Sequence, residues 1–246
     1  MRAISIACVA ALTAVVAQSA SANNWNMTFE GFGLSKNVGV KYDASKNWDS
    51  ATATSFGNIT AGQLEFTVFG KTYLNYCVQL FEGLPQGVNA DWCVTDVASV
   101  PDAPPAPGPM GALIASLVQD LYARFHQSVQ DSIDSVQTAA FQVAIWELTH
   151  ENFTANATVA DVLDEISLEN GAFQQHKNAA NQLVFDAANA MLAQLADGGL
   201  KSLGVNLFGL THETYQDQLV VVPIPAPVLM AGLGLLGAVA LRRRMK

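Results

Sequence analysis

Hydrophobic and polar positions follow two different periods along the chain, and the change of period divides it into two halves. Between residues 24 and 97, segments such as 63–69 and 71–78 alternate or are rich in β-forming residues, and turns with Gly and Asn separate them. From residue 112 onward, apolar residues recur every three or four positions, which is typical of amphipathic helices. The pattern therefore predicts a sheet-rich half followed by a helical half.

The helical half is predicted to contain about four helices. The last of them should end near Gly198 and Gly199, because glycine readily adopts the backbone conformation that terminates a helix. We place the four helices at residues 112–130, 135–150, 159–168 and 179–196.

Strand-like composition returns after the helices, which indicates that the helical block is inserted in a β framework and not appended to it. The connector before the block is rich in proline, which continues neither a helix interior nor a central strand. We therefore predict an α+β fold, an antiparallel β-sandwich or barrel-like sheet with an inserted bundle of about four helices. Its parts are a β half (23–99), a connector (100–110), a helical block (111–199) and returning strands (200–218).

The N-terminus has the three parts of a secretory signal peptide in order. Arg2 precedes an apolar run over residues 3–17, and Ala20-Ser21-Ala22 has the small-x-small form that signal peptidase cleaves. The run is too short for a transmembrane helix. Residues 1–22 are therefore predicted to be removed by signal peptidase on export.

The C-terminus, residues 219–246, has a second tripartite pattern. A proline-containing motif at 222–227 precedes an apolar segment at 228–241, and Arg242, Arg243, Arg244 and Lys246 follow it. Basic residues after the segment place this end in the cytoplasm and the domain outside. Fourteen residues of helix span only about 21 Å against a hydrocarbon core of roughly 30 Å, so we expect a weak, transient transmembrane anchor in the inner membrane.

This tail resembles the PEP-CTERM sorting signals of Gram-negative bacteria, including their Val-Pro-Leu-Pro-Ala variant. The resemblance rests on Pro223 and Pro225, the apolar segment and the cluster Arg242, Arg243 and Arg244, while Ile224 stands where the usual motif has Glu. It implies recognition by an exosortase, removal of the tail, and release to the cell surface or the extracellular space.

Charge excludes one class of partner. All 21 acidic residues lie between positions 23 and 222, and five of the 12 basic residues lie outside that span, which leaves seven basic groups and a net charge of −14. Nucleic-acid binding requires clustered Lys and Arg, and these seven are scattered. We therefore expect no nucleic-acid partner.

The mature chain retains two cysteines after the signal peptide removes Cys8. Cys77 lies near the end of a predicted strand, and Cys93 lies sixteen positions later. Exported proteins tolerate disulfides, so a Cys77–Cys93 bridge is one interpretation of the pair.

Gln142 is the unusual residue of the predicted helix 135–150, because most of its sequence neighbours are apolar. A buried carboxamide without a partner costs about 1–3 kcal/mol, so it must be hydrogen-bonded, solvated or chemically changed. The alternative is a narrow solvated stripe made of Ser135, Thr138, Gln142 and Thr149.

Two motifs resemble those of Cys–Gln thioester-forming domains of bacterial surface proteins. Tyr76-Cys77-Val78 matches the aromatic-Cys-apolar motif on a strand, and residues 141–146 match the Gln-x-Ala-Ile-Trp motif on a helix. Residues 216–219 also look like thioester-type proteins with this sorting signal. The resemblance implies a thioester between Cys77 and Gln142 within residues 23–218. It also implies an apolar environment made of Tyr76, Phe141, Ile145 and Trp146.

Three classes of function remain open. The first is a surface or extracellular-matrix protein, an adhesin-like non-enzyme, that attaches covalently through the thioester to amine-bearing or hydroxyl-bearing partners. The second is a noncovalent matrix protein with a Cys77–Cys93 disulfide, and the third is a cysteine hydrolase. The four histidines form no close pattern with Cys or carboxylates, so we expect neither a metal nor another cofactor.

Overall fold

A computed structural model describes residues 24–43, 54–103, 108–153, 156–201 and 206–222. The signal peptide and the tail from Pro223 through the 228–241 segment to Arg244 lie outside these residues. Within the described ranges, no helix is both long enough and apolar enough to cross a membrane.

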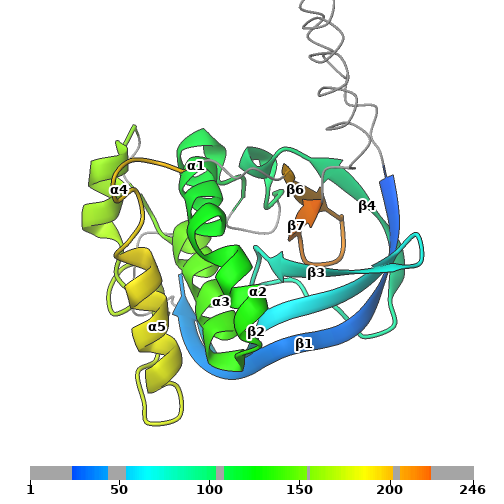
Figure 1. Ribbon diagram of the computed structural model, residues 1–246, viewed down its shortest axis with the longest axis horizontal. Coiled ribbons are helices and arrows are strands. Elements are labelled where there is room, and N and C mark those ends of the chain that lie inside the picture. Colours follow the sequence, from blue (N-terminus) through cyan, green and yellow to red (C-terminus); the bar gives the residue numbers. More distant parts are fainter. Residues whose placement is uncertain (1–23, 44–53, 104–107, 154–155, 202–205, 223–246) are drawn as a thin grey trace, which may run out of the picture.

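The described strands form one antiparallel sheet, in the order β2-β3-β7-β6-β4-β1-β5 (Figure 1). The strands are β1 (Asn24–Tyr42), β2 (Thr54–Val68), β3 (Lys71–Cys77), β4 (Asn89–Thr95), β5 (Phe173–Gln175), β6 (Asn206–Thr211) and β7 (Gln218–Val222). Since β1 also pairs with β2, the first six strands of this order close on themselves. The sheet is therefore barrel-like, and β7 overlaps the start of the segment 219–246 that was assigned to the tail.

The long strands β1 and β2 bend together. Their register shifts at three places, and Gly62 lies at one of them with φ +149°. A Cβ atom there would lie 2.3 Å from the carbonyl oxygen of Leu34, so only glycine fits this close approach. Because of the bend, one half of the β1–β2 ribbon belongs to the barrel and the other half extends along the helices (Figure 1).

The helices lie on one side of the barrel (Figure 1). The predicted helix 112–130 is found as a continuous rod, in which a π-helical turn joins two α-helices. The helical elements are η1 (Val97–Ser99), α1 (Gly111–Leu121), η2 (Tyr122–His126), α2 (Gln127–Ser132), α3 (Ser135–His150), α4 (Val159–Glu165) and α5 (Gln182–Leu192). The strand β5 interrupts the helical block and was not predicted, because three residues are too few to show a period.

Helix α3 is the centre of the molecule. Asp134 caps its N-terminus by accepting a hydrogen bond from the Val136 N–H. Thirteen of its sixteen residues are buried, and it packs between α5 and the sheet (Figure 1). Thr138, Gln142 and Thr149 are at most 2% exposed, so the predicted alternative of a solvated stripe is wrong. The core surrounds this helix on all sides, which is why almost every position is apolar.

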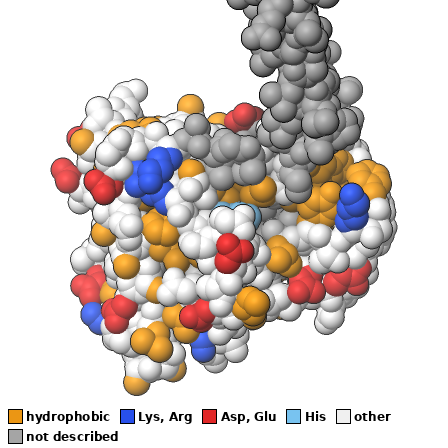
Figure 2. Space-filling model, viewed as in Figure 1, with side chains coloured by type: hydrophobic (Ala, Val, Ile, Leu, Met, Phe, Trp, Pro, Cys, Tyr) orange, Lys and Arg blue, Asp and Glu red, His pale blue; other side chains and the backbone are white. Residues whose placement is uncertain are grey.

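The surface carries few basic groups. On the face in Figure 2, the Lys and Arg side chains of the described residues are isolated from one another, and acidic side chains lie between them.

Candidate functional site

Cys77 is the last residue of β3, at a point where the strand loses one of its neighbours. The pairing of β2 with β3 ends at Leu64 and Asn75, while on the other side β7 still pairs with Tyr76 and Cys77. The edge of β3 that faces away from β7 is therefore open at Cys77, and another group must satisfy its backbone.

The side chain of Gln142 satisfies that edge. The Cys77 N–H donates to Gln142 Oε1 at 3.1 Å, and Gln142 Nε2 donates to the Cys77 carbonyl oxygen at 2.8 Å. The carboxamide thus makes the two hydrogen bonds that a residue of a neighbouring strand would make with Cys77. Gln142 is 1% exposed and Cys77 is 5% exposed, so both residues are buried. The carboxamide of Gln142, which the sequence predicted to need a partner, is hydrogen-bonded to the backbone of Cys77.

Trp146 lies one helical turn after Gln142 and contacts the thiol directly. Its indole Nε1–H donates to Cys77 Sγ at 3.3 Å. Residues four apart share a helix face, so the indole of Trp146 and the carboxamide of Gln142 lie on the same face of α3, and both contact Cys77. The structure therefore brings together Cys77, Gln142 and Trp146, three of the residues singled out from the motifs.

Aromatic rings pack against one another next to this group. Tyr76 and Phe141 have ring centroids 4.9 Å apart, and Tyr122 of η2 lies 4.9 Å from Phe141 and 6.3 Å from Tyr76. Ile145 is also fully buried on α3. Tyr122 was not singled out from the sequence, where it was one more apolar position of an amphipathic helix, and no local pattern tied it to Cys77.

Burial keeps the thiol protonated. It raises the pKa of Cys77 to about 12, although the hydrogen bond from Trp146 and backbone hydrogen bonds act in the opposite direction. Burial also raises the pKa of Tyr122, and the neighbouring Tyr76 and Cys77 add to the effect. The Cys77 thiol is therefore uncharged at neutral pH.

Asp217 fixes the chain just after Cys77. Its carbonyl oxygen accepts from the Val78 N–H at 3.0 Å, and its N–H donates to Gln79 Oε1 at 2.9 Å. Its carboxylate accepts the backbone N–H groups of Asp102 (2.6 Å) and His212 (3.0 Å). Burial raises the pKa of Asp217 to about 7 against the lowering effect of these two hydrogen bonds. The segment 216–219 noted in the sequence thus supports the end of β3.

Cys93 lies on β4, in a different part of the barrel. Cys77 pairs with Gln218, Gln218 with Leu210, and Leu210 with Val94, so β4 is three strands away from β3 along this row. Neighbouring strands are about 4.8 Å apart, and a disulfide needs Cα atoms within about 7 Å. Both described cysteines are free, and the structure does not support the alternative of a Cys77–Cys93 bridge.

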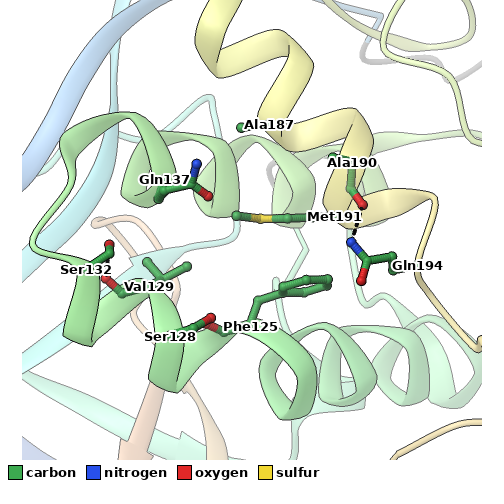
Figure 3. Close-up of a pocket in the computed structure, with 9 residues that line it drawn as sticks. All are labelled: Phe125, Ser128, Val129, Ser132, Gln137, Ala187, Ala190, Met191 and Gln194. Atoms are coloured by element: carbon green, nitrogen blue, oxygen red, sulfur yellow. Dashed lines mark hydrogen bonds between the residues drawn. The ribbon is translucent and has the colours of Figure 1, made fainter.

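Two open pockets lie away from Cys77 and Gln142. One, of about 340 Å³, lies between α2, α3 and α5 and is lined by residues that include Phe125, Val129 and Met191 (Figure 3). The other, of about 470 Å³, is polar and includes Cys93 and His212. Within the described ranges, no group of three or more His, Cys, Asp or Glu side chains is arranged to hold a metal ion.

Comparisons with known proteins give fold-level similarity alone. A scan against protein-family models finds no match, and a search of curated proteins finds none either. Among solved structures, the chain is similar to the N-terminal thioester domain of fibronectin-binding protein SfbI from Streptococcus pyogenes, with a TM-score of 0.39 and 16% identity over 77% of this chain and 95% of that one. It is also similar to the N-terminal domain of the Streptococcus pyogenes pilus tip adhesin Cpa, with a TM-score of 0.39 and 15% identity over 80% of this chain and 99% of that one. Similarity at this level carries no functional argument, so function rests on the contacts of Cys77 and Gln142.

Proposed function

We propose that this chain is an exported surface or extracellular-matrix protein that forms an internal thioester between Cys77 and Gln142 and uses it once for covalent attachment. The partners would carry an amine or a hydroxyl group. The observation that carries the proposal is the pair of hydrogen bonds between the Cys77 backbone and the Gln142 carboxamide, with the Trp146 indole at the sulfur.

The first step of the proposed chemistry is attack of Cys77 Sγ on the carbonyl carbon of Gln142. Negative charge then develops on Oε1, which already accepts the Cys77 N–H at 3.1 Å. A donor positioned before reaction is the usual way in which proteins stabilise such an oxyanion. The backbone of Cys77 would therefore serve as the oxyanion donor for its own side chain.

The protons balance within the site. The thiol proton passes to Nε2 of Gln142, the carbon–nitrogen bond breaks, and ammonia leaves. The raised pKa of Cys77 means that this proton is on the sulfur when the step begins. As the sulfur gives up the proton, the Trp146 N–H, 3.3 Å away, stabilises the negative charge that develops there.

The second step is attack on the thioester by a partner. An amine would form an amide with Gln142 and release the Cys77 thiol, an activated acyl intermediate consumed once. Trp146 again lies at the atom that leaves. The enclosure by Tyr76, Phe141 and Tyr122, each at most 1% exposed, would keep water from hydrolysing the thioester before a partner arrives.

The cysteine-hydrolase alternative finds less support in the same contacts. A nucleophilic cysteine in a hydrolase needs an adjacent base to take its proton. The side chain that hydrogen-bonds Cys77 Sγ is the indole of Trp146, which donates a proton and cannot accept one. A raised thiol pKa also opposes turnover by a thiolate.

Export and sorting belong to the proposal as well. Signal peptidase would remove residues 1–22, and an exosortase would recognise Pro223, Pro225 and the arginine cluster after a transient stay in the inner membrane. Peptide mapping of the exported form from the native host should find no peptides from Arg242 to Arg244. Their presence at full abundance would instead favour a permanent anchor.

Intact-protein mass tests the chemical part. The mature protein should weigh one ammonia less than its sequence mass, and methylamine should add its full mass at Gln142 while freeing the Cys77 thiol. Cys93→Ser is the matched control, because it removes the other thiol of the mature chain without touching the site.

A further inference from the structure

Asn75 and Gln218 flank Cys77 on one face of the sheet. Side chains two apart on a strand point to the same face, so Asn75 and Cys77 share one. Gln218 is directly opposite Cys77 on β7, where the Cβ atoms of paired residues are about 5 Å apart. The thiol residue therefore has one carboxamide along its strand and another across from it.

Both carboxamides are buried and incompletely bonded. Asn75 and Gln218 are 0% exposed. Neither Nδ2 nor Oδ1 of Asn75 has a hydrogen-bond partner among the described residues, and the same holds for Oε1 of Gln218. The Nε2 of Gln218 donates to the carbonyl oxygen of Gln216 at 2.8 Å, so only its oxygen is left over.

Their neighbours explain why no protein group bonds them. Leu64 pairs with Asn75 on one side, and Leu210 pairs with Gln218 on the other. Both leucines are at most 2% exposed. Unpartnered buried polar groups are rare and destabilising, and here they occur together beside the candidate nucleophile. A molecule that carries N–H groups would satisfy the two unpartnered oxygens, Oδ1 of Asn75 and Oε1 of Gln218.

We propose that Asn75 and Gln218 form a subsite for the nitrogen of the reaction, first for the ammonia expelled from Gln142 and then for the primary amine that attacks the thioester. The proposal rests on the proposed function and deepens it, because it favours amines over hydroxyl groups. The carboxamide oxygens Oδ1 and Oε1 are the acceptors, and the nitrogen is the donor.

The chemistry requires such acceptors. Ammonia is released between residues that are almost fully buried, where water does not directly receive it. In the reverse direction, a primary amine gives one proton to Cys77 Sγ as the carbon–sulfur bond breaks, and it keeps a second N–H. An alcohol gives up its single hydroxyl proton and brings no further donor from the attacking atom. Two unpartnered oxygen acceptors beside Cys77 therefore match a primary amine better than an alcohol.

The test separates formation of the thioester from its reaction. Asn75→Leu and Gln218→Met replace each carboxamide with an apolar side chain of similar shape. Both variants should still lose one ammonia in the intact mass, and both should react with methylamine at least about tenfold more slowly than the unchanged protein. Asn75→Leu removes a carboxamide whose two polar atoms are both unsatisfied, so this variant should also unfold at equal or higher urea concentration, and its slow reaction cannot be attributed to a damaged fold.

Gln175→Met is the matched control. Gln175 is a buried carboxamide on β5 whose Nε2 and Oε1 also have no partner in the described residues, but it lies outside the site. Its variant should react at the unchanged rate. Methylamine rates for Asn75→Leu and Gln218→Met equal to that of Gln175→Met would overturn the subsite and leave the thioester standing. An unchanged protein at full sequence mass would overturn the thioester and the subsite together.

Discussion

Cys77 and Cys93 belong to one barrel, yet their surroundings differ in every respect that matters for chemistry. Cys77 is buried, its backbone bonds a carboxamide, and its sulfur accepts an indole N–H. Cys93 is partly exposed, its thiol lies 3.9 Å from the carbonyl oxygen of the neighbouring Val94, and it borders a polar pocket. Cys77, and not the more exposed Cys93, is therefore the candidate acyl acceptor, because a carboxamide and an indole N–H lie at Cys77.

The largest expected effect follows from removing either end of the bond. Cys77→Ala and Gln142→Ala should each abolish both the loss of ammonia and the addition of methylamine, because no thioester can form. Cys93→Ser should retain both. Intact mass before and after methylamine treatment measures all three, and loss of the effect in Cys93→Ser would contradict the contrast between the two thiols.

The next effect concerns the indole. Trp146→Phe keeps an aromatic ring but removes the N–H that lies 3.3 Å from Cys77 Sγ, so thioester formation and methylamine addition should each slow about tenfold. The rates come from mass spectra taken at intervals. Trp92→Phe is the control, because the Nε1 of this buried indole has no partner among the described residues. Equal slowing in both variants would show that packing, and not the hydrogen bond, is responsible.

The carboxylate next to the site should make stability depend on pH. The pKa of Asp217 is raised to about 7 in the folded chain, above its ordinary value of 3.8, so the folded state binds this proton more tightly than the unfolded state. The stabilisation is present at low pH and is lost as pH rises through 7, by up to a few kcal/mol.

Urea unfolding between pH 5 and 8 measures this effect, and Asp217→Asn should flatten the curve in that interval. Asp120→Asn is the control. Asp120 is also fully buried and accepts backbone N–H groups, but its pKa is lowered, so its variant should leave the dependence near pH 7 in place. A variant of Asp217 with the unchanged pH profile would assign the dependence to another group, such as the buried Glu147, whose pKa is also raised.

The smallest effect concerns Cys93 itself. Because it is partly exposed and outside the site, Cys93→Ser should change the unfolding free energy by less than about 0.5 kcal/mol. In the native protein, iodoacetamide should label Cys93 and leave Cys77 unmodified, as peptide mapping can show. Labelling of Cys77 at a comparable rate would mean that its enclosure is open.

Much of the fold could be predicted from the sequence. The two hydrophobic periods predicted a sheet-rich half and a helical block, and the apolar neighbours of Gln142 correctly indicated that its helix is buried. The sequence did not decide between a sandwich and a barrel, because closure depends on pairing between β1 and β2 and on the order of β4, β6 and β7, which no local period records. The short strand β5 was not predicted, because three residues are too few to show a period.

The site was predictable only where a motif named it. Tyr76, Cys77, Phe141, Gln142 and Trp146 came from two motifs, and the structure brings them together. Tyr122, Asn75 and the carboxylate of Asp217 reach the site through tertiary packing. In the sequence, Asn75 was one residue of a strand. Its pairing with the buried Leu64 and the missing hydrogen-bond partners of its carboxamide appear only in the folded structure.

The most direct test of the account is the intact mass of freshly purified mature protein, measured under denaturing, nonreducing conditions. The account predicts a mass one ammonia below the sequence value, with Gln142 and Cys77 joined in the peptide map and the Cys93 thiol free. A mass at the full sequence value, or lower by only two hydrogens with Cys77 bridged to Cys93, would contradict it.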